Sequence, residues 1–110
     1  MPTLCRANTA DTHYYRGNPN GTGYLKGTHL PTRPVVRWSY VPKAAGGGRA
    51  PTAHDPVAIE DGVVYCGDDL GRLYALSAED GAVIWIHEHG QGQIFTPATI
   101  ADDLIYFTCS

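Results

Sequence analysis

The stretch that decides the fold is residues 56–85, PVAIEDGVVYCGDDLGRLYALSAEDGAVIW, together with a partial second copy in residues 97–110, PATIADDLIYFTCS. The second segment aligns with the start of the first. Four aligned positions are identical: Pro56/Pro97, Ile59/Ile100, Asp61/Asp102 and Tyr65/Tyr106. Short apolar runs separated by Asp/Gly turns, repeating after about forty residues, indicate a protein built from repeated β-sheet units.

The spacing of the turns predicts an antiparallel meander. Four strands are expected near residues 57–60, 63–67, 72–77 and 82–88, and a hairpin over residues 97–108. Asp61-Gly62 is a two-residue hairpin turn of the kind that tolerates positive φ. Connections this short exclude parallel pairing, which needs a long crossover.

The runs inside this meander, 63–66, 73–76 and 83–86, are apolar on both faces of the expected sheet. Antiparallel sheets with one wet face alternate instead. Because the connections are too short to bring helices over the sheet, other sheets must cover both faces, as in the ring of a β-propeller. We therefore predict an all-β fold of propeller blades, each a four-stranded antiparallel meander. A ring needs about four to eight blades, so a chain of 110 residues would hold an incomplete ring.

The chain divides into four predicted parts: an extended tail at 1–34, a lone strand and Gly-rich loop at 35–55, the first complete blade at 56–96, and a truncated second blade at 97–110. The lone strand is expected at 34–41, PVVRWSYV, without a hairpin partner. We expect the chain to be a piece of a propeller, or a protomer that assembles with others.

The segment 75–85, ALSAEDGAVIW, resembles the repeat of quinoprotein-type, pyrroloquinoline-quinone-like β-propellers. The resemblance covers residues 34–110 and is to an N-terminal fragment of such a protein. The blade-motif residues that carry the resemblance are Ala75, Leu76, Gly81 and Trp85, with Asp61, Gly62 and Tyr65 upstream. The resemblance implies that Trp85 docks between adjacent blades, packing over the Ala and Gly of its own motif. It also implies that the lone strand with Trp38-Ser39 completes the last blade of the ring.

Charge and hydropathy exclude several classes of partner. The net charge of −3, with eight Lys and Arg scattered along the chain, leaves no basic footprint for nucleic acid. No apolar run approaches the ~18 residues of a membrane-spanning helix. The family resemblance suggests a periplasmic or secreted protein, although residues 1–17 lack the apolar core of a secretory signal.

Candidate metal ligands are few. His87-Glu88-His89 places two imidazoles on one face of a strand, a spacing that can chelate Zn²⁺ or Cu²⁺ if His54 or Asp55 supplies a third ligand. The favoured alternative is a polar strand end, so we predict no metal site. Asp68, Asp69, Asp102 and Asp103 lack the spacing of an EF-hand calcium loop, and are expected to be turn residues.

The three cysteines, Cys5, Cys66 and Cys109, form no C-x-x-C motif, so no disulfide framework is predicted. Cys66 and Cys109 stand in apolar strand patterns and are expected to be buried small side chains.

Two functions remain. The favoured one is a non-catalytic binding or scaffold segment, similar to the outer-membrane assembly lipoproteins that share this repeat. Its partners would be further blades or other protein chains, including copies of itself. The alternative is the N-terminal part of a quinone-dependent dehydrogenase, which would use pyrroloquinoline quinone and Ca²⁺. The chain has neither an adjacent cysteine pair nor a catalytic motif, so no catalytic or cofactor-binding residues are predicted.

Overall fold

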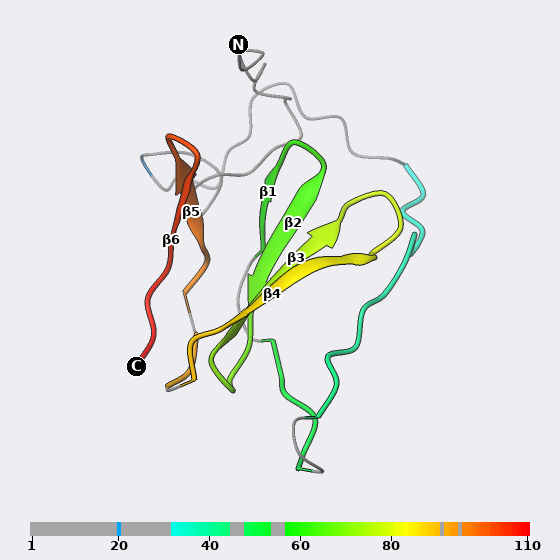
Figure 1. The fold of residues 1–110 in the computed structure, drawn as a ribbon. Helices are drawn as coiled ribbons and strands as arrows, with labels where there is room; N and C mark the ends of the chain where they lie inside the picture. The colour runs from blue at the N-terminus through cyan, green and yellow to red at the C-terminus, as the bar shows by residue number, and fades with distance from the viewer. Residues whose placement is uncertain (1–19, 21–31, 45–47, 54–56, 91, 95) are drawn as a thin grey trace.

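The computed structural model describes residues 20, 32–44, 48–53, 57–90, 92–94 and 96–110. The strands are β1 (Ala58–Glu60), β2 (Val63–Gly67), β3 (Arg72–Ser77), β4 (Val83–Glu88), β5 (Thr99–Ala101) and β6 (Leu104–Tyr106). β1 to β4 form one antiparallel sheet in sequence order, and β5 and β6 form a second sheet (Figure 1). The described residues contain strands and no helix, which confirms the all-β meander.

Both short hairpins turn through aspartates with positive φ. Asp61 and Gly62 have φ of 48° and 73°, and Asp102 and Asp103 have φ of 51° and 61°. Two consecutive positive φ values match the right-handed twist of the flanking strands, and Asp and Gly tolerate them best. The repeated Asp turn in the sequence is therefore a repeated backbone geometry.

One face of the four-stranded sheet is covered by the segment that precedes it. Val64, Tyr74 and Leu76 form a buried cluster on this face, which we call the strap face. Side chains alternate between the faces of a strand, and the register pairs Val64 with Leu76. Trp38 and Tyr40 pack against the cluster from outside the sheet. In Figure 1, the segment 32–44 runs beside this sheet on the side away from β5 and β6.

The opposite face packs against the second hairpin. Ala58 of β1, Ile100 of β5 and Ala98, just before β5, form a buried cluster, to which Tyr65 and Ile105 add partly buried surface. β3 is covered on both of its faces, because its residues Arg72 to Leu76 are all buried. The prediction that both faces of the meander are covered therefore holds for β3.

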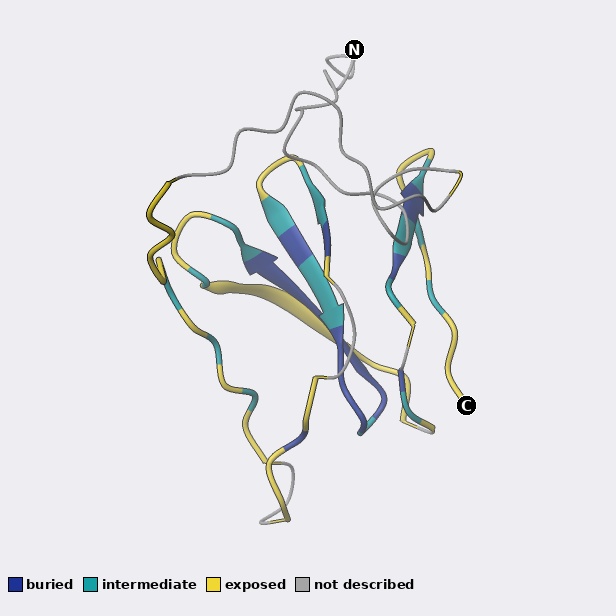
Figure 2. Cartoon of the chain, turned by 180° about the vertical axis from the view of Figure 1, so that it is seen from behind, coloured by how far each residue is buried: buried dark blue, intermediate teal, exposed yellow. Residues whose placement is uncertain are grey.

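β4 departs from that prediction, because all six of its residues are exposed (Figure 2). β4 is the outer edge of the sheet and pairs with β3 alone. Its register slips between Ala75 and Leu76, where Leu76 faces Val83 and Ala75 faces Trp85. A bulge of this kind bends a strand. The strand is apolar from Val83 to Ile86, yet the described residues leave each of these four residues more than a third exposed.

The segment 34–41, predicted to be a lone strand without a hairpin partner, belongs to neither of the two sheets formed by the described residues. The segment is held by side-chain contacts to the strap face instead of by a ladder of backbone hydrogen bonds. The predicted tail at 1–34 lies almost wholly outside the described residues.

Candidate functional site

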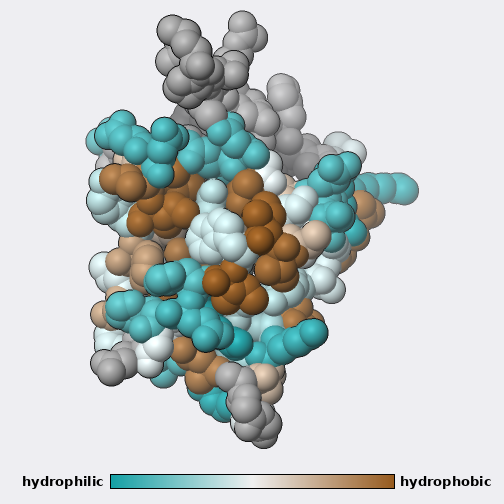
Figure 3. All heavy atoms as spheres, viewed as in Figure 1, coloured by the Kyte–Doolittle hydropathy of each residue, from teal (hydrophilic) through white to brown (hydrophobic). Residues whose placement is uncertain are grey.

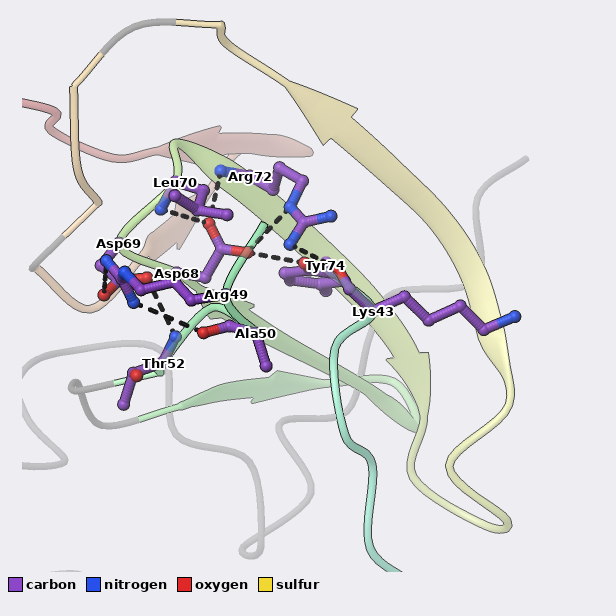
Figure 4. A network of polar contacts seen from close by, with 9 residues as sticks. All are labelled: Lys43, Arg49, Ala50, Thr52, Asp68, Asp69, Leu70, Arg72 and Tyr74. Carbon is purple, nitrogen blue, oxygen red and sulfur yellow. Dashed lines mark hydrogen bonds and ion pairs between the residues drawn. The ribbon is translucent and has the colours of Figure 1, made fainter. Parts of the chain in front are cut away.

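A network of polar contacts is centred on Asp68, in the turn between β2 and β3 (Figure 4). Its side chain is fully buried. Oδ1 accepts hydrogen bonds from the backbone N–H groups of Leu70 and Arg72, both at 2.9 Å. Oδ2 accepts from Arg72 Nε at 2.9 Å and from Tyr74 Oη at 2.6 Å. A buried carboxylate is stable only when paired and hydrogen-bonded in this way.

The neighbouring Asp69 attaches a remote segment to the same turn. Its Oδ1 accepts from the backbone N–H of Thr52 at 2.9 Å, and its own N–H donates to the Thr52 carbonyl at 3.2 Å. Its Oδ2 pairs with Arg49 at 2.7 Å. The predicted role of these aspartates in the turn is correct for Asp68, which bonds its own backbone. The sequence did not indicate that Asp69 also binds the remote residues Arg49 and Thr52.

Arg72 and Tyr74 extend the network from Asp68 to the strap face. Arg72 Nη2 donates to the Lys43 carbonyl at 3.0 Å, and the Arg72 guanidinium lies 5.5 Å from the centre of the Tyr74 ring. The Tyr74 ring packs on Tyr40 with centres 5.6 Å apart. Burial and the hydrogen bond to Asp68 raise the pKa of the Tyr74 phenol far above its ordinary value. Tyr74 therefore remains a hydrogen-bond donor at neutral pH.

The tryptophan that packs on Gly81 is Trp38, whereas the docking of Trp85 between adjacent blades stays a prediction. A Cβ at Gly81 would lie 2.6 Å from the Trp38 ring. Trp38 Nε1 donates to the Ala78 carbonyl at 2.9 Å, so the indole lies against Ala78 and Gly81. Glycine permits this approach because it has no side chain.

Trp85 lies elsewhere, on the outer strand. Its ring packs on Tyr65 with centres 5.9 Å apart, and 37% of the residue is exposed. The motif residues Ala75 and Leu76 are buried in β3, whereas Asp61 and Gly62 form the β1–β2 turn. The structure thus places the motif residues in one sheet but brings them to no common pocket.

Apolar side chains gather on the exposed strand β4, as Figure 3 shows from the same side as Figure 1. The exposed apolar residues of this strand are Val83, Ile84, Trp85 and Ile86. Leu104 and Tyr106 of β6, the last strand of the second sheet, are also more than half exposed. Exposed apolar edge strands of this kind mark sites where another chain adds or packs.

His87 of β4 and His89, just after the strand, pack on an aromatic ring. The ring centres of His87 and His89 lie 6.1 and 6.3 Å from that of Phe107 and 6.5 Å from each other, so the three rings form a triangle. No group of three potential ligands that could hold a metal occurs among the described residues. His54 and Asp55, the suggested third ligands, lie outside those residues.

The two described cysteines differ from the prediction that both are buried. Cys66 is half-buried against the strap face, and burial is the main cause of its raised pKa. Cys109 is exposed, because it follows the end of β6 at the open edge of the second sheet. Neither forms a disulfide.

A cleft of about 190 Å³ opens between the two hairpin turns. Three of its seven lining residues carry carboxylates. The lining residues are Glu60, Asp61, Val63, Tyr65, Ile100, Asp103 and Ile105. Desolvation raises the pKa of the Tyr65 phenol, and Glu60 and Asp61 raise it further.

No helix long and apolar enough to cross a membrane is found in the part of the chain that the structure describes. No protein-family model matches the chain, and no curated protein does. Among solved structures, BamB from Moraxella catarrhalis is similar, with a TM-score of 0.50 and 28% sequence identity. The match covers 67% of this chain and 21% of the BamB chain, so this chain spans about a fifth of BamB's length.

BamB is a β-propeller. The similarity and the observed strand order agree with the fold expected from the repeat. The chain has an all-β, β-propeller-type fold, in which one four-stranded antiparallel blade stands beside a two-stranded hairpin and the described strands close no ring.

Proposed function

We propose that this chain is a non-catalytic, pyrroloquinoline-quinone-like propeller segment that binds other protein chains as a scaffold. The observation that carries the proposal is β4, an edge strand on which all six residues are exposed and four consecutive residues are apolar. Its free edge can accept another strand, and its apolar side chains can pack against a second sheet. The similarity to BamB supports a propeller scaffold in particular.

The domain divisions belong to the same proposal. Residues 56–96 would act as one complete blade, and residues 97–110 as the first half of the next. Leu104 and Tyr106, exposed on β6, would then meet strands that complete the second blade. The partners are thus further blades or other chains that present a β-strand and an apolar surface.

Charged substitutions on β4 test this function. Lysine on an edge strand opposes strand addition by placing a charge where an apolar partner would pack. The Ile84→Lys/Ile86→Lys chain is compared with wild type and with Val35→Lys/Val36→Lys, which changes two residues that are highly exposed outside the sheet. Sedimentation velocity over a range of concentrations measures self-association.

We expect the wild type and the Val35/Val36 variant to associate as concentration rises, and the β4 variant to remain smaller. A compact wild-type monomer at every concentration would contradict the proposal. Equal loss of association in both variants would also contradict it, because the effect would then follow charge alone.

A further inference from the structure

Two imidazoles come together where β4 ends. His87 belongs to β4, and His89 continues the extended backbone, because its N–H donates to the Gly71 carbonyl at 2.9 Å. Residues two positions apart in an extended segment project from the same face. The two ring centres are 6.5 Å apart, and both residues are exposed. One solute can therefore reach both rings.

Phe107, which follows β6, packs against both imidazoles. Its ring centre lies 6.1 Å from that of His87 and 6.3 Å from that of His89, and the ring planes are inclined by 65° and 84°. Edge-to-face packing of this kind is favourable between aromatic rings. A residue outside β4 thus holds the two imidazoles near each other, which reduces the entropy lost when both bind one ligand.

The separation of the two imidazoles matches the size of a transition-metal chelate. Cation–nitrogen bonds of about 2.0–2.1 Å place two ring centres about 4.5–6.4 Å apart, depending on the angle at the cation. The observed 6.5 Å lies at the outer limit of this range. A small rotation of the exposed side chains brings a nitrogen of each ring to one ion.

The small number of protein ligands favours one kind of ion. No group of three candidate ligands occurs in the part of the chain that the structure describes. Zn²⁺ sites in proteins use three or four protein ligands. Cu²⁺ accepts a tetragonal set of nitrogen and oxygen ligands, and it binds such ligands more tightly than the other divalent first-row metals do. Two imidazoles, with water at the remaining positions, form a ligand set of this type.

We propose that His87 and His89 form a surface site for a Cu²⁺ ion, with Phe107 as the residue that positions the two imidazoles. The sequence alone favoured a polar strand end for this pair. The proximity of the two rings and their shared contact with Phe107 are what the structure adds. The site is independent of the proposed scaffold function, because the apolar residues of β4 supply no ligand.

Isothermal titration calorimetry with Cu²⁺ near neutral pH tests the site. Accessible thiols, which also bind Cu²⁺, are alkylated beforehand. The wild-type chain is compared with His87→Gln/His89→Gln and with His13→Gln/His29→Gln, which removes the same number of imidazoles elsewhere in the sequence. We expect the first variant to bind its tightest ion at least about tenfold more weakly, because the second imidazole acts as an intramolecular ligand. The control variant should bind as the wild type does.

Equal Cu²⁺ affinity of the wild type and the His87/His89 variant would overturn the proposal. An equal loss of affinity in both variants would also overturn it, because binding would then depend on the number of histidines and not on their placement. Circular dichroism confirms that each variant is folded as the wild type is.

Fluorescence quenching locates the ion while both ligands are kept. Trp85 precedes His87 by two positions on the same face of β4, whereas Trp38 packs against Gly81. Trp38→Phe leaves Trp85 as the single indole, and Trp85→Phe leaves Trp38. We expect Cu²⁺ to quench the emission of Trp85 to a greater extent than that of Trp38. Equal quenching of the two indoles, or stronger quenching of Trp38, would refute the placement of the ion.

Electron paramagnetic resonance examines the wild-type chain directly and tests the role of Phe107. The spectrum of bound Cu²⁺ should show two nitrogen ligands. Phe107→Ala should weaken Cu²⁺ binding but keep this spectrum, and Phe107→Tyr, which retains the ring, should restore the affinity. A wild-type spectrum without two nitrogen ligands would overturn the site. Unchanged affinity in Phe107→Ala would show that Phe107 does not position the imidazoles.

Discussion

Tyr74 donates its phenolic hydrogen to Oδ2 of Asp68 at 2.6 Å, inside a blade where both side chains are almost completely buried. The same carboxylate oxygen receives Arg72 Nε. A buried charge that loses a partner is costly because no water replaces the missing hydrogen bond. The β2–β3 turn is thus stabilised by a polar cluster within an apolar sheet, and this cluster also reaches the segments before the blade.

Tyr74→Phe removes this hydrogen bond while keeping the ring against Tyr40. Hydrogen bonds to charged groups contribute about 1.5–3 kcal/mol, and we expect a loss of unfolding free energy in that range. Urea denaturation followed by circular dichroism measures the loss. Tyr106→Phe, at a residue 54% exposed, is the matched control and should be close to neutral. Equal stability of the two variants would show that Asp68 does not depend on the Tyr74 hydroxyl.

The raised pKa of Tyr74 predicts a loss of stability in alkaline solution. The unfolded phenol titrates at about pH 10, and the folded phenol titrates well above this value because it is buried and bound to Asp68. The stabilisation is complete below the unfolded pKa and is lost as pH rises through the folded pKa, since unfolding then releases a proton.

Urea midpoints measured between neutral pH and about pH 11 should fall more steeply for the wild type than for Tyr74→Phe, which has no phenol to ionise. Parallel curves would mean that another group causes the alkaline loss.

The two tryptophans should differ in their contribution to stability. Trp38 is half-buried, donates a hydrogen bond to Ala78 and packs on Gly81, whereas Trp85 lies on the exposed strand against Tyr65. Truncation of a fully buried Trp costs about 3–5 kcal/mol of unfolding free energy. Trp38 is only partly buried, so Trp38→Ala should cost somewhat less than this, and Trp85→Ala should cost less than Trp38→Ala. Urea unfolding of Trp38→Ala and Trp85→Ala compares them. A larger loss of unfolding free energy in Trp85→Ala would contradict this order and would support the docking role that the motif implies for Trp85.

The sequence was sufficient for the meander because its signals are local. Asp61-Gly62 requires a particular backbone geometry, and the alternation of apolar runs with turns leaves one strand order. The repeat also predicted the second hairpin, since Asp102-Asp103 takes the same positive φ. These features depend on neighbouring residues and not on how the sheets pack.

The identity of the contacts between remote segments could not be predicted in the same way. The motif contains Trp85 and not Trp38, and only the packing of residues 38–43 on the sheet brings Trp38 to Gly81. Asp68 carried a partial signal, because Arg72 and Tyr74 follow it at alternate positions of one strand and can both face it. Asp69 binds Arg49 and Thr52, which are distant from it in sequence, and no local pattern indicated these contacts.

We expect no saturable binding of pyrroloquinoline quinone. Cofactor pockets typically enclose about 300–1,000 Å³, whereas the cleft between the hairpin turns has a volume of about 190 Å³ and is lined by Glu60, Asp61 and Asp103. These carboxylates would repel the carboxylates of the quinone. Tryptophan fluorescence during titration with the quinone and Ca²⁺ checks this, with free tryptophan as the control for inner-filter quenching. Saturable quenching at low micromolar quinone would favour a dehydrogenase fragment.

Gly81→Ala separates the backbone cost of a glycine from its packing role, because Gly62 provides a matched control. The two glycines have φ of +75° and +73°, so alanine is strained equally at both, by about 1–2 kcal/mol. The new Cβ meets nothing within 4 Å at Gly62 but lies 2.6 Å from the Trp38 ring at Gly81. Gly81→Ala should therefore lower the unfolding free energy more than Gly62→Ala does. In a Trp38→Ala background the excess should disappear, since alanine leaves space for the Cβ, and this double-mutant cycle isolates the contact. If Gly81→Ala still lowered the unfolding free energy more than Gly62→Ala in the absence of the indole, the cause would lie in the β3–β4 turn and not in the packing of Trp38.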